Sequence, residues 1–392
     1  MDINDNHPIC TWENTLLRIA YEKAVIFSTG KSGINKKKYY HYTSIETLQK
    51  IINDNTLLLT HCQFLNDSAE FISGSEKIIE ILDKNEKLPK KIKKYINVIK
   101  KTNESHRNPH RNIINSGTFT NRLYHQINYC MPEAFSISFC ERDDLRYQWQ
   151  TYAGESGISI EFDFTGYDFL IKVNKFSDAK KEVTEKADKE KIFIKLPGLR
   201  PLPMIYKEKR LVASIATLID EWLDGPMDQL SNYESALAPI FFLASFYKNK
   251  EFKIEKEHRI ALREEDFSFF FSSSEYKTYY IDISYTLSEG VLKPRMTLSW
   301  QPIDADKENS KIKSPKSPIK AITVGPGKNQ DFAYKSICHF LDYGQHKIEK
   351  INKLGKYIYE ENKNSEYGGR YVTRCGIKVR KSKSSYLFPR GG

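Results

Sequence analysis

The stretch KYYHYTSIETLQKIINDNTLLLTHCQFLNDSAEF, residues 38–71, decides how the fold is interpreted. Aromatic residues at 39–43 predict a strand, and a helix is expected over about 45–52, with Ser44 as its N-cap. TLLLT at 56–60 predicts a second strand. A strand, a helix and a strand in close succession form either a pocket-bearing unit or an ordinary packing unit, and the sequence leaves both open.

Strand and helix patterns continue along the rest of the chain. AFSISF at 134–139 and ISIEFDF at 158–164 predict strands, and the polar stretch between them predicts a helix. An amphipathic helix is expected at 210–223 and a buried one at 236–250, followed by further strands and a helix at 331–342. Widely separated strands with helices between them favour an α+β fold over a regularly alternating doubly wound sheet.

Composition shifts along the chain suggest its domain organisation. Residues 1–36 are expected to form an N-terminal helical extension and linker, and 37–387 a single α+β catalytic-like domain. Polar stretches at about 84–130 and 170–235 are interpreted as insertions in that domain, and 388–392 as a tail.

Length and composition indicate a globular protein without a membrane segment. The chain has 392 residues, 40% of them hydrophobic, enough for one large or two ordinary domains. No apolar run approaches the roughly 18 residues that cross a bilayer, and the N-terminus is acidic and polar, unlike a signal peptide. We therefore expect a cytoplasmic protein. Its six cysteines are scattered without a C-x-x-C pair, which argues against structural zinc and a disulfide framework.

The positive charge is concentrated in two segments. The net charge is +11, and residues 87–101 and 377–390 hold much of the excess. Such a surface attracts polyanions. In the first segment Ile92, Ile96 and Ile99 fall at helical spacing, which equally indicates an amphipathic helix docked through its isoleucines with lysines in water. Both interpretations can hold together.

Several enzyme signatures are missing. The sequence has no G-x-G-x-x-G after a strand, no G-x-x-x-x-G-K-[ST], no G-x-S-x-G and no H-E-x-x-H. Rossmann dehydrogenases, P-loop NTPases, serine hydrolases and zincins are therefore unsupported. GPGKNQ at 325–330 is more simply a turn than a phosphate loop.

Three segments set polar or aromatic side chains beside apolar ones, as pocket walls do. They are YHYTS at 40–44, SFCERDDLRYQWQTYAGESGISIEF at 138–162 and FKIEKEHRI at 252–260. If the third is a strand, Glu255, Glu257 and Arg259 share one face. Two carboxylates beside a guanidinium suit either a structural ion network or a site that handles developing positive charge.

These segments, taken in order, carry a family resemblance. The likeness rests on the ordered series YHYTS…L..I.....L.LT....LND..E, SISF, W..YA...GISIEFD, FKIEKEHRI, IKAITVGP and VRKSKSSY. From about Tyr39 to Tyr386 the chain thereby resembles the bacterial domain of unknown function 2971 family. The ordered set carries the likeness, because no single motif decides it.

That family's layout in turn resembles the ADP-ribosyltransferase fold, a mixed split β-sheet core, here with helical insertions. The resemblance implies that His41 binds the nicotinamide-side ribose of NAD, that Tyr152 or Trp149 stacks on nicotinamide, and that Glu257 binds the ribose 2′-OH. Glu257, His41 and Tyr152 are its expected catalytic residues. The expected NAD-binding residues are His41, Tyr42, Thr43, Trp149, Tyr152, Ser138, Asn66 and Asp67. Tyr42 stands where many transferases have Gly, and SIS at 136–138 matches their Ser-Thr-Ser element in part.

The implied function is an NAD-dependent ADP-ribosyltransferase-like effector, a toxin or antiphage defence component, that uses NAD as substrate and no metal. A nucleic acid or an acidic protein is the expected acceptor, and such an effector implies a neutralising partner protein. No membrane partner is expected.

Two other functions stay open at this point. One is a nucleic-acid-binding or sensing module that grips phosphates through 90–101 and 378–383. The other is a metal-dependent nuclease that holds Mg²⁺ with carboxylates. Its candidate ligands are Asp67, Glu70, Glu255 and Glu257. Asn66, Asp67 and Glu70 cap the following helix or line the pocket.

Overall fold

The computed structural model describes the chain in a series of segments separated by gaps. The described residues are 38–65, 68–90, 92–94, 96–97, 100, 134–153, 157–175, 192–196, 198–223, 237, 240–263, 279–288, 290–303, 317–344, 371–372 and 376–384. The expected N-terminal extension at 1–36 and the tail at 388–392 lie outside them.

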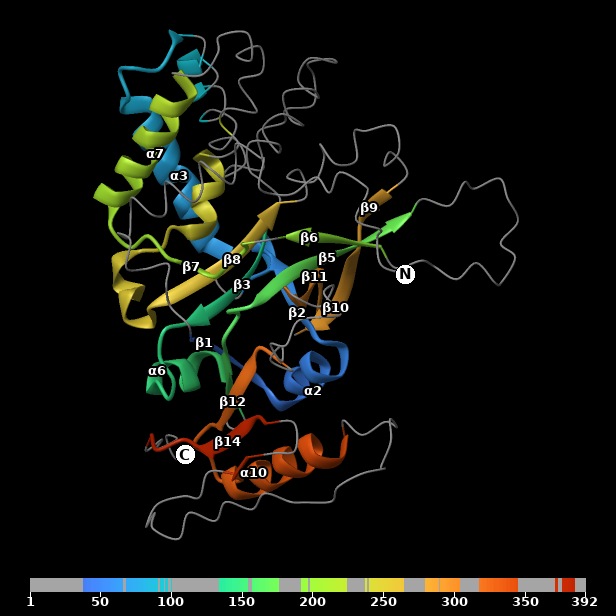
Figure 1. Cartoon of the computed structure of the whole chain (residues 1–392). Coiled ribbons are helices and arrows are strands. Elements are labelled where there is room, and N and C mark those ends of the chain that lie inside the picture. The colour runs from blue at the N-terminus through green and yellow to red at the C-terminus, as the bar shows by residue number, and fades with distance from the viewer. Residues whose placement is uncertain are drawn as a thin grey trace.

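The architecture is mixed α+β, built on one large open sheet (Figure 1). Its strands run in the order β13-β14-β12-β4-β1-β3-β2-β11-β5-β6, with β7 and β8 beside β3, β9 beside β5, and β10 beside β11. Among the described residues β12 and β14 are parallel, and the other pairs are antiparallel. The strands are β1 Tyr39–Ser44, β2 Thr56–His61, β3 Ala134–Cys140, β4 Gly157–Phe162, β5 Tyr167–Lys175, β6 Ile192–Leu196, β7 Leu202–Pro203, β8 Glu257–Arg263, β9 Tyr279–Ile281, β10 Ile283–Ser288, β11 Val291–Pro302, β12 Ile319–Val324, β13 Tyr371–Val372 and β14 Lys378–Lys381.

Helices cover the sheet at both of its ends and beside its centre. In Figure 1, α3 and α7 lie together at one end of the molecule, α10 lies against β12 and β14 at the other, and α2 lies between. A core of large aromatic and aliphatic side chains packs around the central strands, and a second core joins α3, α7 and the 240–246 segment. The helices are α2 Ile45–Asp54, α3 Ser68–Lys84, α6 Arg146–Gln148, α7 Glu208–Leu223 and α10 Gln330–His339. None of the helices in the described part of the chain is long and apolar enough to cross a membrane.

The predicted strand–helix–strand unit is confirmed as β1, α2 and β2. Ser44 caps α2 as expected, because its hydroxyl accepts a hydrogen bond from the Thr47 N–H over 3.2 Å. Asn55 ends the helix in the left-handed region, with φ of 51°, a conformation that asparagine tolerates well.

Two predicted elements differ from the structure. The polar helix expected before β4 is shorter in the structure and consists of α6 and a π turn over Trp149–Ala153. Asp144, which precedes α6, has a positive φ of 56°, so the helix begins only after it. The Asp144 carboxylate accepts from the Trp149 indole over 2.9 Å. The 252–260 segment is a strand only from Glu257, since Lys256 has a φ of 46° and ends a 3₁₀ helix over Lys250–Glu255.

The 236–250 segment is buried as expected but is not one continuous α-helix. In its described part, helical residues at 240–242 pass into a 3₁₀ turn over Leu243–Phe246. The stretch at 170–235, interpreted as an insertion, supplies most of β5 together with β6, β7 and α7.

The sheet splits beside the middle of β3. One edge of β3 pairs with β8 along its whole length. The other edge pairs with β2 only at Ser136 and Phe135, and with β1 only at Cys140. β1 and β2 therefore diverge over Ile137–Phe139, and α2, which joins them, spans the gap.

Candidate functional site

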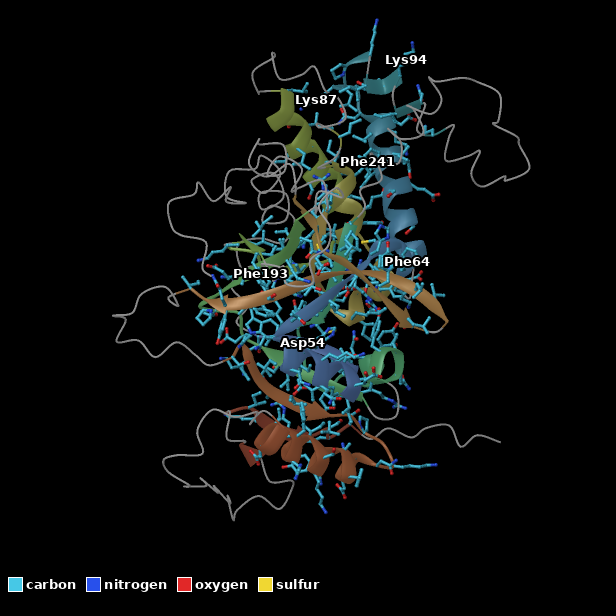
Figure 2. The ribbon with its side chains drawn as sticks, turned by 90° about the vertical axis from the view of Figure 1, so that its right-hand side faces the viewer. Asp54, Phe64, Lys87, Lys94, Phe193 and Phe241 are labelled. Carbon is cyan, nitrogen blue, oxygen red and sulfur yellow. The ribbon has the colours of Figure 1, made fainter. Side chains whose placement is uncertain are left out.

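A cavity of about 550 Å³ lies at this split. Its walls come from β1, α2, β2, β3, the start of β8 and the β10–β11 hairpin. Asp54 at the end of α2 and Phe64 after β2, both labelled in Figure 2, belong to its lining. The split thus produces a hollow bordered by two consecutive strands. The strand–helix–strand unit at the start of the domain is therefore a pocket-bearing unit and not only a packing unit.

His41 lines the cavity and is held at the split by the backbone of β3. Its Nδ1 lies 2.9 Å from the carbonyl oxygen of Ser138. A carbonyl only accepts, so Nδ1 carries the hydrogen. Burial lowers the pKa of His41, and the bond to Ser138 opposes this shift only in part. His41 is therefore neutral at physiological pH, and its Nε2 is a hydrogen-bond acceptor.

Glu257 is a firmly held carboxylate at the cavity wall, and the residue is 4% exposed. Its Oε1 accepts from the Ser138 hydroxyl and from Arg259 Nε, each over 2.5 Å. Its Oε2 accepts from Lys248 Nζ over 3.0 Å. Burial alone raises the pKa of this carboxyl, but the charges of Arg259 and Lys248 outweigh burial and lower the pKa to about 2. Glu257 stays ionised at neutral pH.

Lys248 joins Glu257 to a second buried carboxylate. The Lys248 side chain is 2% exposed, and its ammonium group also donates to Glu255 Oε2 over 2.5 Å. Arg259 Nη1 donates to the carbonyl of Ser245 over 3.2 Å. The expected face shared by two carboxylates and a guanidinium is present as an ion network, although Glu255 reaches it from the 3₁₀ helix rather than from the strand.

The aromatic candidates separate in space. Trp149 is 2% exposed and packs edge-on against Tyr42, with ring centroids 4.8 Å apart, so it supports the cavity wall from behind. Tyr152 is 41% exposed and lines the cavity. The Tyr42 hydroxyl donates to the Arg142 carbonyl over 3.2 Å and accepts from the Leu145 N–H over 2.9 Å, which fixes the wall between β1 and α6.

Six of the expected site residues meet at one cavity. They are His41, Tyr42, Thr43, Ser138, Tyr152 and Glu257. Trp149 is not among its lining residues, and Asn66 and Asp67 lie outside the described residues. Sequence reasoning missed Lys248 and Arg295. The alternation of Lys293 and Arg295 in LKPRMTLSW was the available signal, since alternate strand residues share a face.

Two of the four carboxylates proposed for a nuclease are engaged by cations of the chain itself. Glu255 and Glu257 are bonded to Lys248, and Glu257 also to Arg259. Asp67 and the side chain of Glu70 lie outside the described residues. Within the part of the chain that the structure describes, no group of three or more His, Cys, Asp or Glu side chains could hold a metal ion.

The two basic segments lie at opposite ends of the molecule. Lys87 and Lys94 lie at the end formed by α3 and α7 (Figure 2), whereas β14 lies at the end with α10 (Figure 1). Ile92 and Ile96 are fully buried, as expected for a helix docked through its isoleucines. Lys87 forms an ion pair with Asp220 over 3.0 Å. The described parts of the two basic segments therefore form two separate surfaces rather than one continuous groove.

Residues 148–260 match a family described as protein of unknown function, DUF2971. The expected family resemblance is confirmed over this segment. The DUF2971 match contains Tyr152, Glu257 and Arg259, whereas His41 and Ser138 precede it. No curated protein matches the chain, and no solved structure does.

Proposed function

We propose that this protein is an NAD-dependent ADP-ribosyltransferase that transfers ADP-ribose to a nucleic acid or protein acceptor. In this proposal it acts in the cytoplasm as an effector, a toxin or a component of antiphage defence. The observation that carries the proposal is the arrangement at the split: an ionised, immobilised Glu257 carboxylate, bonded to Ser138, borders a cavity that His41 also lines.

Glu257 has one acceptor position left for a ligand. A carboxylate offers about four lone-pair sites, and Ser138, Arg259 and Lys248 fill three of them. The remaining site on Oε2 suits the 2′-hydroxyl of a ribose. Arg259 and Lys248 keep the group charged and fix its orientation, so it needs no reorganisation when positive charge develops nearby.

The reaction breaks the bond between C1′ of the ribose and the nicotinamide nitrogen. The bonding electron pair leaves with nicotinamide and neutralises its ring, and C1′ acquires oxocarbenium character, as in glycoside hydrolysis. The acceptor's nucleophile then forms the new bond at C1′ and releases its proton to water. Glu257 stabilises the developing cation, and the neutral His41 Nε2 accepts from a ribose hydroxyl.

Tyr152 has the position required to hold the leaving group. Its ring is partly exposed and borders the same cavity, so it offers an aromatic face to the nicotinamide ring. Trp149 contributes through Tyr42, which it packs against, and not by touching the ring.

The test is incubation of the purified protein with NAD labelled in the adenine ring, together with DNA, RNA and protein from a cell extract. We expect nicotinamide release and transfer of label to one acceptor class, both insensitive to a chelator. Intact NAD with all three acceptors would remove the transferase proposal. Chelator-sensitive cleavage of DNA or RNA without NAD consumption would favour the nuclease instead.

A further inference from the structure

Arg295 lies on the cavity wall without an acidic partner among the residues that the structure describes. Its Nε donates to the Thr286 hydroxyl over 3.0 Å, and its Nη1 donates to the Thr60 hydroxyl. Burial lowers its pKa, as expected for a cation withdrawn from water with no carboxylate beside it. A half-buried guanidinium held by neutral hydroxyls is costly unless an anion reaches it.

Two other cations of the cavity, Arg259 and Lys50, differ from Arg295 because their acids are in place. Arg259 is bonded to Glu257 over 2.5 Å, and Lys50 to Glu46 over 2.7 Å. Of the five N–H groups of a guanidinium, the two threonines engage only two in Arg295. The remaining donors form a fork that matches a phosphate oxygen pair.

The register of the sheet places Arg295 on the same face as the catalytic candidates. Arg295 is paired with Thr60, and Thr60 with Ser136. Directly paired residues share a face, and Ser138 is two residues further along that face, bonded to Glu257. Two strand spacings separate Arg295 from Ser136, which is about 10 Å. A ligand that touches both Glu257 and Arg295 must therefore be elongated.

The β10–β11 hairpin presents mainly polar side chains to the cavity. Thr286, Ser288, Lys293 and Arg295 line the cavity together with Leu287, whereas Tyr285 is exposed and is not among the lining residues. Lys293, paired with Thr286 across the hairpin, adds a second positive charge to the same wall. The hairpin thus contributes a cationic wall opposite the Glu257 end of the cavity.

We propose that Arg295 binds a phosphate group of the ligand in this cavity, the pyrophosphate of a dinucleotide. The identity of that ligand rests on the proposed function, because the transferase reaction supplies the dinucleotide. The two threonines preorganise the guanidinium, and the phosphate provides the counter-charge that the described protein residues do not.

The test measures the affinity for ADP-ribose by titration calorimetry, in wild type and in Arg295→Gln. ADP-ribose carries the pyrophosphate but no nicotinamide, so its binding does not depend on catalysis. We expect Arg295→Gln to weaken binding about 10- to 100-fold. Lys209→Gln is the matched control, because it removes the same charge from an exposed lysine on α7, outside the cavity lining, and should leave the affinity unchanged.

Arg295→Lys guards against a folding defect, since it keeps the charge and loses the fork. An intermediate loss of affinity in a variant with unaltered circular dichroism supports the subsite. Equal affinity of wild type and Arg295→Gln overturns it, even if wild type consumes NAD. An Arg295-dependent affinity without nicotinamide release supports the subsite and removes the transferase reaction. No ADP-ribose binding by wild type overturns the subsite.

Discussion

Two buried carboxylates of the sheet, Glu161 and Glu257, have similar partners and different surroundings. Glu161 on β4 is 5% exposed and accepts from Arg380 over 3.0 Å and from Lys38 over 2.8 Å. Glu257 on β8 accepts from an arginine and a lysine as well, but it also borders the cavity at the split. Buried ion networks therefore do not identify a functional site by themselves. The divergence of β1 and β2 is what places one of them at a cavity.

The largest effect is expected from Lys248→Met. The substitution removes the cation that joins Glu255 to Glu257, while Arg259 stays bonded to Glu257. Breaking a buried pair in this way costs about 3–5 kcal/mol of unfolding free energy. Urea unfolding of wild type and variant measures it. A loss below about 1 kcal/mol would show that water reaches Lys248 and that the network is not closed.

The comparison of the two carboxylates can be tested by Glu257→Gln and Glu161→Gln. Both substitutions keep the shape of the side chain and remove the charge. We expect Glu257→Gln to lower the rate of nicotinamide release about 100- to 1,000-fold, because it removes a fixed charge near the reacting carbon. Glu161 lies outside the cavity lining, so its variant should retain the wild-type rate once the folded fractions are matched. Equal losses in the two variants would mean that Glu257 acts only on stability.

The pH dependence of stability should reveal Glu257 directly. Its pKa falls from an ordinary 4.5 to about 2 in the folded protein. A carboxyl whose pKa is lowered in the folded protein stabilises the folded state at pH values above its pKa in the unfolded chain. This contribution disappears as the pH falls from 4.5 to 2. It is on the order of 3 kcal/mol. Unfolding free energies at several pH values should therefore decline less steeply in Glu257→Gln, and identical pH slopes would contradict the assigned shift.

The smallest effect is expected from the hydroxyl groups beside the two networks. Ser138 donates to Glu257 over 2.5 Å, and Thr323 donates to Asp143 over 3.2 Å beside Arg380. Removing a hydrogen bond to a charged group typically costs about 1.5–3 kcal/mol. Ser138→Ala should lower the turnover of NAD about tenfold, whereas Thr323→Val should leave it unchanged. Equal turnover in the two variants would show that Ser138 does not orient the carboxylate.

Local patterns in the sequence predicted the elements on which the site is built. The alternation of AFSISF predicted β3, because successive strand residues point to opposite faces, and Ser44 marked the start of α2 through its capping hydroxyl. His41, Ser138 and Glu257 were named from the resemblance, and the structure brings them to one cavity.

The rest depends on contacts between distant parts of the chain. Arg295 meets Thr60 across 235 residues, a contact fixed by the pairing of β11 with β2 that no local pattern encodes. The left-handed turn at Lys256 places Glu255 outside the expected strand. The sequence could not predict this turn, because nothing in the side chain of lysine favours that conformation. The burial of Trp149 follows from its packing against Tyr42, and helical spacing alone does not distinguish a buried aromatic residue from one that borders a ligand.

The most direct test of the central claim is a crystal structure of Glu257→Gln with NAD, since this variant should hold the substrate without cleaving it. The account predicts the dinucleotide in the cavity at the split of the sheet. The nicotinamide ribose should lie beside His41 and Gln at position 257, and the pyrophosphate beside Arg295. NAD bound elsewhere, or a cavity that stays empty at saturating NAD, would contradict the account.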